Sequence, residues 1–200
     1  MVGTVIDQPV HIVGIGGTLR LGSSTERALR AVLNLAEAAG ATTQCFGGAE
    51  LSELEMYDPR SAERSPGALR LVSELRKADG VVLASPGYHG GVSGLVKNAV
   101  DYAEDLREDA RPYFQGLPVG CIATGAGWQG VVTAVNQLRT IVHALRGWPT
   151  PLGICINTVE TPFNEEGPGS VKIGEQLSIM QREVVESASL QRDARRAGSV

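Results

Sequence analysis

Five short apolar segments alternate along the chain with amphipathic segments, and no other feature constrains the fold as strongly. The apolar segments read HIVGI, TTQCF, GVVLAS, PVGCIAT and PLGICINTV. They are rich in β-branched residues and lack polar alternation, which predicts strands that are buried on both faces of a sheet. The segments between and after them repeat apolar residues at helical spacing, as in ERALRAVLNLAEAAG. This alternation predicts a doubly wound α/β fold, in which a five-stranded parallel sheet carries helices on both faces.

The composition is that of one globular domain with a sizeable core. The chain has 200 residues, of which 42% are hydrophobic and 20% are charged, and this profile predicts a soluble protein. We expect a single domain over residues 1–186 and a flexible polar tail over 187–200. The net charge of -4 disfavours binding to nucleic acid, because a phosphate backbone is bound by a basic surface.

Signals for membranes and for oxidising compartments are missing from the sequence. No apolar run approaches the roughly 20 residues that cross a bilayer, and the N-terminal MVGTVIDQPV has neither the basic flank nor the apolar core of a signal peptide. The three cysteines lie far apart within apolar runs, which suggests neither a disulfide framework nor a metal site. We therefore expect a cytoplasmic protein that binds no membrane and no metal.

A glycine-rich stretch, GGTLRLGSST, lies between the first predicted strand and the first predicted helix. A turn of this kind offers backbone N–H groups and a positive helix end to an anion. The dinucleotide fingerprint fails because Leu19 stands where its third glycine is needed, and the Walker A motif fails because Ser23 replaces its lysine. The remaining polar side chains suit a single terminal phosphate: Thr18, Arg20, Ser23, Ser24 and Thr25. The alternative is that Ser24 or Thr25 only caps the helix and that Arg20 is solvated.

Two more glycine-rich loops follow the third and fourth predicted strands, and they read PGYHGGVSG and GAGWQG. In a doubly wound sheet these loops meet the first one beyond the carboxyl ends of the strands. Glycine lets a backbone approach a flat ring closely, and Tyr88 and Trp128 supply aromatic surface. The three loops together predict a ligand that has one phosphate and one flat polar ring system. His89 could donate a hydrogen bond to this ligand or could only shape its turn.

Two motifs resemble those of the NADPH-dependent FMN reductase family, which contains flavodoxin-like quinone, azo-dye and chromate reductases. GTLRLGSST is similar to its phosphate loop, with Thr18 in place of the usual serine, and SPGYHGGVSGLVKNAVDY is similar to its second signature. The resemblance implies the flavodoxin-like strand order 2-1-3-4-5. It also implies FMN-binding residues in three groups: Thr18, Arg20, Ser23, Ser24 and Thr25 at the phosphate, Pro86, Gly87, Tyr88, His89 and Gly90 along the ribityl chain and the ring, and Thr124, Gly125, Gly127 and Trp128 across the ring. The sequence departs from the family at Gly87, where many members have a larger residue, and in the loop after the fourth strand.

By this resemblance, the chain is expected to pass a hydride from NADPH or NADH through FMN to a small-molecule acceptor such as free flavin, a quinone, an azo compound or a metal oxyanion. The flavin carries the chemistry, so no catalytic side chain is expected apart from possible assistance by His89. Lys97, Asn98 and Asp101 are expected to tie their helix to its loop or to a second subunit. A homodimer or homotetramer is implied. The alternatives are a flavodoxin-type electron carrier without NAD(P)H activity and a binding module that has lost its flavin.

Overall fold

The computed structural model describes residues 8–164 and 167–197 and has a parallel β-sheet at its centre. Its main strands are β1 (His11–Gly16), β2 (Thr42–Phe46), β3 (Gly80–Tyr88), β5 (Pro118–Gly125) and β6 (Trp148–Asn157). They are hydrogen-bonded in the order β2-β1-β3-β5-β6. Counted along the chain, these five strands have the order 2-1-3-4-5, which confirms the predicted flavodoxin-like fold. A short sixth strand, β4 (Gly91–Val92), pairs antiparallel with the end of β3.

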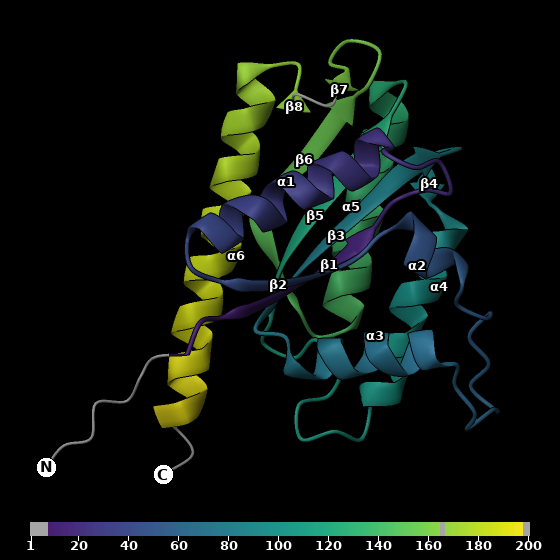
Figure 1. Ribbon diagram of the computed structural model, residues 1–200, viewed down its shortest axis with the longest axis vertical. Helices are drawn as coiled ribbons and strands as arrows, with labels where there is room; N and C mark the ends of the chain where they lie inside the picture. The colour runs from purple at the N-terminus through teal and green to yellow at the C-terminus, as the bar shows by residue number, and fades with distance from the viewer. Residues whose placement is uncertain (1–7, 165–166, 198–200) are drawn as a thin grey trace, which may run out of the picture.

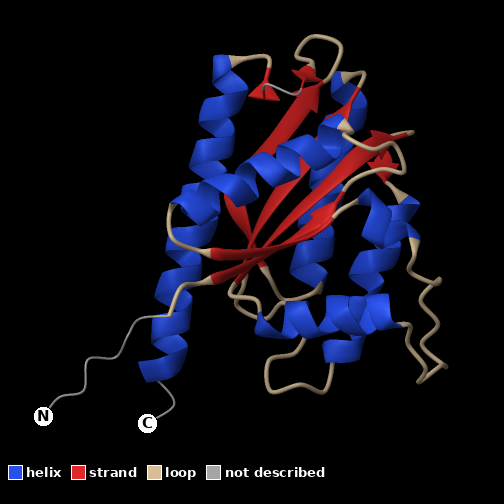
Figure 2. Ribbon diagram, viewed as in Figure 1, coloured by secondary structure: helices blue, strands red, loops and turns tan. Residues whose placement is uncertain are grey.

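Helices cover both faces of this sheet (Figures 1 and 2). Helix α1 (Ser24–Ala38) crosses one face, and α6 (Val171–Ala197) packs beside it. The other face is covered by α3 (Pro66–Lys77), α4 (Gly94–Asp101), the 3-10 helix η1 (Tyr102–Leu106) and α5 (Trp128–Ala144). A short helix, α2 (Gly48–Ser52), follows β2. The two layers of helices bury the central strands between them.

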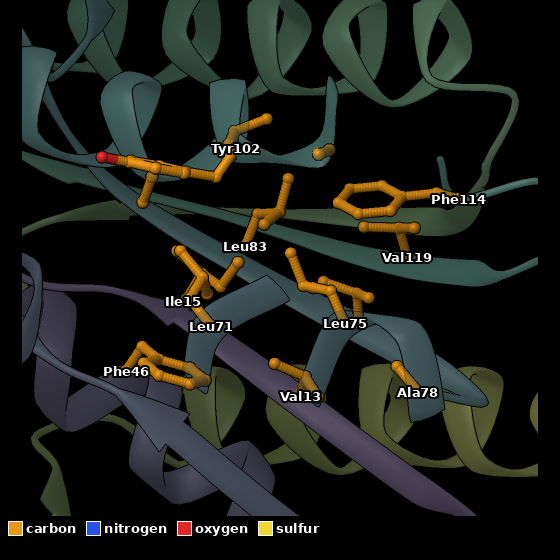
Figure 3. Close-up of a cluster of buried hydrophobic side chains, with 14 of the residues drawn as sticks. Val13, Ile15, Phe46, Leu71, Leu75, Ala78, Leu83, Tyr102, Phe114 and Val119 are labelled. Atoms are coloured by element: carbon orange, nitrogen blue, oxygen red, sulfur yellow. The ribbon is translucent and has the colours of Figure 1, made fainter. Parts of the chain in front are cut away.

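Alternate residues of the central strands enter different cores. Ile12 and Val82 pack with α1 and α6, whereas Val13, Val81 and Leu83 face the opposite way. Figure 3 shows this second cluster, in which side chains of β1 and β3 meet those of α3 and two buried aromatic rings, Tyr102 and Phe114. Apolar residues on both faces of one strand explain why the sequence shows no polar alternation there.

Serine side chains begin three of the helices. Ser23, Ser65 and Ser93 have extended backbones, and each side-chain oxygen accepts a hydrogen bond from the backbone N–H three residues later. Such N-caps satisfy a donor that has no partner within the helix. The cap of α1 is therefore Ser23, whereas the sequence alone suggested Ser24 or Thr25.

Three expectations about secondary structure need correction. The outer strands are not buried on both faces: β2 and β6 carry exposed and half-buried residues along their lengths, because each has only one neighbouring strand. The segment VSGLVKNAVDYAEDL at 92–106 has the apolar spacing of one helix, but the structure divides it into α4 and η1. The stretch before the last helix, expected to be a loop, contains a small hairpin of β7 (Phe163–Asn164) and β8 (Gly167–Pro168).

The C-terminal boundary also differs from the prediction. Helix α6 runs on to Ala197, so residues 187–197 are helical and not a flexible tail. Its last turns are anchored, since Ala188 and Arg192 are buried and Arg192 donates a hydrogen bond to the carbonyl of Gln8. The polar composition of residues 187–197 did not predict this contact. The stem of an arginine can cover apolar surface while its charged end still finds a polar partner. The last three residues of the predicted tail, 198–200, lie outside the described residues.

Candidate functional site

A cavity of about 540 Å³ lies at the carboxyl ends of β1, β3 and β5, and its size is within the range of small-ligand sites. The three predicted loops meet there. The lining residues are Thr18, Arg20, Ser23, Ser24, Thr25, Pro86, Gly87, Tyr88, His89, Thr124, Gly125, Ala126 and Thr158. Of the predicted site residues, Gly90, Gly127 and Trp128 do not line it. Ala126 belongs to the predicted glycine-rich loop after the fourth strand. Thr158 was not predicted, although the end of the fifth strand lies at the same edge of a sheet with this strand order.

The first of these loops is held by its own hydrogen bonds. The hydroxyl of Thr18 accepts from the backbone N–H of Arg20 at 3.2 Å, and the backbone N–H of Ser23 donates to the carbonyl of Arg20 at 3.2 Å. The Ser23 hydroxyl accepts from the backbone N–H of Glu26 and so keeps its own proton for another acceptor. The first N–H groups of α1, at Ser24 and Thr25, have no acceptor within the helix and lie at the cavity. This arrangement presents N–H and O–H donors to an anion.

Helix α2 supports this loop from outside the cavity. A Cβ atom on Gly48 would lie 1.9 Å from the carbonyl oxygen of Thr18, so only glycine allows the two backbones to approach so closely. No helix was predicted at Gly48–Ser52, because five residues are too few to show a repeated helical spacing of apolar residues. A side chain at Gly48 would displace the loop that carries Thr18 and Arg20.

A buried hydrogen bond joins the first loop to the end of β5. The hydroxyl oxygens of Thr25 and Thr124 are 2.6 Å apart, and both residues are almost fully buried. One hydroxyl donates its proton to the other, which leaves a single proton of the pair for another acceptor. The two threonines were predicted as separate contacts to a ligand, whereas the structure shows that they bind each other.

The second loop is a hairpin formed by β3 and β4. Tyr88 pairs with Gly91, and the two residues between them, His89 and Gly90, both have positive φ angles, 51° and 78°. Two successive positive φ angles are the signature of a type I′ turn. His89 therefore shapes the turn, one of its two expected roles, and also lines the cavity. Tyr88 is 57% exposed beside it.

Two side chains outside the cavity, Ser85 and Gln137, hold this hairpin in place. The buried Ser85 hydroxyl accepts from the backbone N–H of Ser93 at 2.9 Å and donates to the carbonyl of Pro86 at 2.9 Å. Gln137 of α5 accepts from the backbone N–H of Val92 at 3.0 Å and donates to the carbonyl of Gly90 at 3.4 Å. No sequence motif pointed to Gln137, because it lies 45 residues from Val92.

The glycine at position 87 is explained by the start of α5. A Cβ atom on Gly87 would lie 2.8 Å from the carbonyl oxygen of Gly130, and one on Gly130 would lie 3.1 Å from the carbonyl oxygen of Gly87. The first turn of α5 thus occupies the space that a larger residue at 87 would need. The chain thus has glycine in place of the larger residue of the family motif at the point where α5 packs closely against Gly87.

Trp128 belongs to the rim of the site and not to its lining. Its indole N–H donates to Glu160 Oε1 at 2.8 Å, and the same oxygen accepts from the side-chain amide of Asn157 at 2.8 Å. The ring is 49% exposed. Glu160 therefore ties the start of α5 to the loop after β6, and Trp128 is turned toward this loop.

Asn98 has a structural role, but it ties its helix to the segment at residues 55–57 and not to the loop before α4. Its side chain accepts from the backbone N–H of Tyr57 and donates to the carbonyl of Glu55, both at 2.9 Å. The hydroxyl of Tyr102 donates to the same carbonyl at 2.9 Å. Lys97 and Asp101 form an ion pair on the surface of α4. These contacts bind α4 and η1 to the segment before α3.

The cysteines and His11 supply no nucleophile or base at the cavity. Burial raises the pKa of Cys121 to about 12 and that of Cys45 to about 11, so both thiols stay protonated at neutral pH. His11 is bonded to Glu74 at 2.8 Å and to Thr42 at 3.0 Å. Within residues 8–164 and 167–197, no helix has the length and apolar character to cross a bilayer, and no three metal-binding side chains are grouped as a site.

Comparisons with known proteins agree with this geometry. The family model of the NADPH-dependent FMN reductases matches residues 10–158. An NAD(P)H-dependent FMN reductase of Pseudomonas aeruginosa is 28% identical over 161 residues, which are 79% of this chain and 83% of that protein. An FMN-dependent NADPH-azoreductase of Staphylococcus aureus is 37% identical over 92 residues, which are 45% of this chain and 44% of that protein.

Solved structures show the same fold at lower identity. A flavoenzyme NAD(P)H:(acceptor) oxidoreductase of Paracoccus denitrificans has a TM-score of 0.71 and 19% identity, with 91% of this chain and 98% of that chain covered. An oxidoreductase of Corynebacterium diphtheriae has a TM-score of 0.70 and 20% identity, with 90% and 97% covered. The fold and the cavity thus define a flavodoxin-like protein with a ligand site at the carboxyl edge of its sheet. The chain belongs to the NADPH-dependent FMN reductase family, which confirms the expected enzyme class, an oxidoreductase that uses FMN and NAD(P)H.

Proposed function

We propose that the cavity at the carboxyl ends of β1, β3 and β5 holds FMN and that the enzyme uses it to carry a hydride from NADPH or NADH to a small-molecule acceptor. One observation carries this proposal. The anion-binding first turn of α1 and the glycine-rich hairpin of β3 and β4 line the same cavity of about 540 Å³. A ligand with a phosphate at one end and a flat ring at the other matches both parts.

The phosphate end is proposed to lie against the loop before α1. Backbone N–H groups of Ser24 and Thr25 and the hydroxyl of Ser23 offer hydrogen-bond donors there. Arg20 is exposed at the mouth of the cavity and adds a positive charge and a planar pair of donors. The proton left over from the pair of Thr25 and Thr124 is a further donor.

The ring end is proposed to lie between the hairpin and the loop after β5. Pro86, Gly87 and Tyr88 would flank the ring on one side, and Gly125 with Ala126 would line the other. FMN supplies the hydride chemistry when it is bound. The protein orients the ring, offers backbone donors along the cavity wall and leaves one side open for the nicotinamide and the acceptor. His89 lines the cavity and is proposed only to assist binding.

The acceptor is proposed to be a small aromatic or oxidised compound such as free flavin, a quinone, an azo compound or a metal oxyanion. The names of the relatives support this range, since one reduces FMN and others reduce azo compounds. Helix α5 approaches the hairpin closely at Gly87 and Gly130. This approach narrows the space beside the hairpin and is proposed to limit the size of the acceptor.

We also propose that the enzyme is a homodimer or homotetramer and is cytoplasmic. A groove of about 420 Å³ runs between α4, η1 and α5, where a second subunit was expected, and Tyr57, Ile141 and Leu145 give it an apolar lining. Sedimentation of the purified protein tests the oligomeric state. The three cysteines are free thiols, which suits a reducing compartment.

The proposed function is tested by the absorption spectrum of the purified protein loaded with FMN. Under anaerobic conditions, addition of NADPH or NADH is expected to bleach the flavin bands, and a subsequent acceptor is expected to restore them. Flavin bands that persist after both nicotinamides would identify an electron carrier instead. A protein that never binds FMN would overturn the assignment of the cavity.

A further inference from the structure

Trp128 lies where two loops beside the proposed FMN site are tied together. The indole N–H of Trp128 and the side-chain amide of Asn157 both donate to Glu160 Oε1, each at 2.8 Å. Asn157 is buried at the last position of β6, and its amide oxygen accepts from the backbone N–H of Val159 at 3.1 Å. One carboxylate oxygen therefore joins the first residue of α5 to the loop that follows β6.

Both of the segments that Glu160 joins continue from residues that line the cavity. Ala126 precedes Trp128 by two positions, Thr158 precedes Glu160 by two positions, and both Ala126 and Thr158 are lining residues. The backbone N–H of Thr158 donates to the carbonyl of Gly125 at 2.8 Å, and its hydroxyl donates to the same oxygen at 3.2 Å. The pair of Trp128 and Glu160 is thus fixed relative to the cavity wall.

A second aromatic ring, that of Tyr88, is carried by an element that touches the start of α5. Strands β3 and β5 are parallel neighbours, and the close approach of Gly87 to the carbonyl of Gly130 holds the hairpin against the first turn of α5. Tyr88 follows Gly87 directly, and Trp128 begins that turn. Each ring is about half exposed. Two open aromatic surfaces are therefore brought to the same side of the cavity.

The cavity lining offers little charge with which to recognise an acceptor. Arg20 is the only arginine, lysine, aspartate or glutamate among the described lining residues, and the proposed function assigns it to the phosphate. Its neighbours Leu19 and Leu21 are largely exposed, as is Val159 beside Glu160. An aromatic acceptor gains from contact with apolar and aromatic surface, whereas a hydrated oxyanion meets no second arginine or lysine in this lining to replace its water.

We propose that Trp128 is a specificity-determining residue of the acceptor site and that Glu160 is the positioning residue that holds it. The exposed part of the indole stacks on a planar aromatic acceptor, while its N–H edge stays bonded to Glu160. This bond restricts rotation of the ring and so reduces the entropy that is lost when the acceptor binds. The inference rests on the proposed function and narrows its range of acceptors to free flavin, quinones and azo compounds.

Binding of an aromatic probe to the oxidised, FMN-loaded protein tests the role of Trp128, because no turnover occurs without a reductant. The probe is anthraquinone-2-sulfonate, a planar and soluble quinone, and isothermal titration gives its Kd. W128A is expected to raise this Kd roughly three- to tenfold. W148A is the matched control, since Trp148 is also an exposed tryptophan but begins β6 at the opposite edge of the sheet. It should leave the Kd within about twofold.

Two substitutions at Glu160 separate its hydrogen bonds from its charge. E160Q keeps a side-chain oxygen that can accept from Trp128 and Asn157, E160A removes this oxygen, and both remove the negative charge. E160A is expected to raise the Kd of the probe about threefold, and E160Q should restore most of the wild-type affinity. In a W148F background Trp128 is the only tryptophan. Quenching of its fluorescence by acrylamide should increase in E160A and not in E160Q.

Reoxidation rates test the class of acceptor. The FMN-loaded protein is reduced with NADPH under anaerobic conditions and is then mixed with 2-methyl-1,4-naphthoquinone or with ferricyanide, which has no ring. The ratio of the quinone rate to the ferricyanide rate is expected to fall in W128A and to keep its wild-type value in W148A.

Three results would overturn the proposal. An unchanged Kd for anthraquinone-2-sulfonate in W128A, or an unchanged ratio of the two rates, would exclude Trp128 as a specificity-determining residue. Equal Kd values in E160A and E160Q would exclude the positioning role of Glu160. Failure of the proposed function is seen separately and earlier, as a protein that binds no FMN or whose flavin bands NADPH does not bleach before any acceptor is added.

Discussion

The hydroxyl of Thr25 lies 2.6 Å from the hydroxyl of Thr124, in a buried hydrogen bond between the first turn of α1 and the end of β5. This bond connects the loop proposed for the phosphate of FMN with the strand that leads to the loop proposed for its ring. Both threonines also line the cavity. The pair therefore sets the spacing between the two halves of the site.

Replacement of either threonine should destabilise the protein. T25V leaves the buried Thr124 hydroxyl without this partner, which costs about 1 to 3 kcal/mol of the free energy of unfolding. The double variant T25V/T124V removes both polar groups, so its loss should be smaller than the sum of the single losses. Urea denaturation of the four proteins measures the coupling. Strictly additive losses would show that the hydroxyl pair contributes nothing specific.

Arg20 should contribute to FMN affinity and not to folding. Arg20→Ala is expected to weaken FMN binding by about 1.5 to 3 kcal/mol, roughly 10- to 100-fold, which is the usual value of a hydrogen bond to a charged group. Flavin fluorescence quenching gives the Kd. Arg107→Ala is a matched control, since Arg107 is exposed and pairs only with nearby glutamates in the contacts described. An unchanged Kd in Arg20→Ala would contradict the assignment of the phosphate loop.

Gln137 should position the hairpin of β3 and β4 from outside the cavity. Gln137→Ala removes the acceptor of the Val92 N–H, so the Val92 amide should exchange its hydrogen faster. FMN affinity should fall by about 0.5 to 1.5 kcal/mol, a few-fold in Kd. Asn136→Ala, the exposed neighbour on α5, should change neither quantity. Normal exchange at Val92 in Gln137→Ala would exclude this positioning role.

Glu55 should make stability depend on pH in the acid range. Hydrogen bonds from Ser65, first from its side chain and then from its backbone, lower the pKa of Glu55 from 4.5 to about 2. A carboxyl with a lowered folded-state pKa stabilises the protein above its unfolded-state pKa, and the contribution is lost as the pH falls through the folded-state value. Glu55→Gln should therefore be less stable than wild type at neutral pH. Urea denaturation as a function of pH should show this gap closing between about 4.5 and about 2. A gap that does not change with pH would contradict this prediction.

The parts of the fold that were predicted correctly depend on local signals. Apolar runs without polar alternation identified the buried central strands, and apolar residues at helical spacing identified the main helices. Glycine-rich turns after the first, third and fourth predicted strands located the cavity, because parallel strands bring their carboxyl ends to one edge. The predicted helix boundaries were less accurate. One predicted helix is divided into α4 and η1, and α2 was not predicted.

The sequence by itself determined the strand and helix order, the sheet edge that carries the site and the type of ligand that the loops suit. Only the tertiary structure decided which side chains pair across that site. Thr25 with Thr124, Trp128 with Glu160 and Gln137 with Val92 are joined over 99, 32 and 45 residues of chain. No periodicity records such contacts, because they depend on how strands and helices pack.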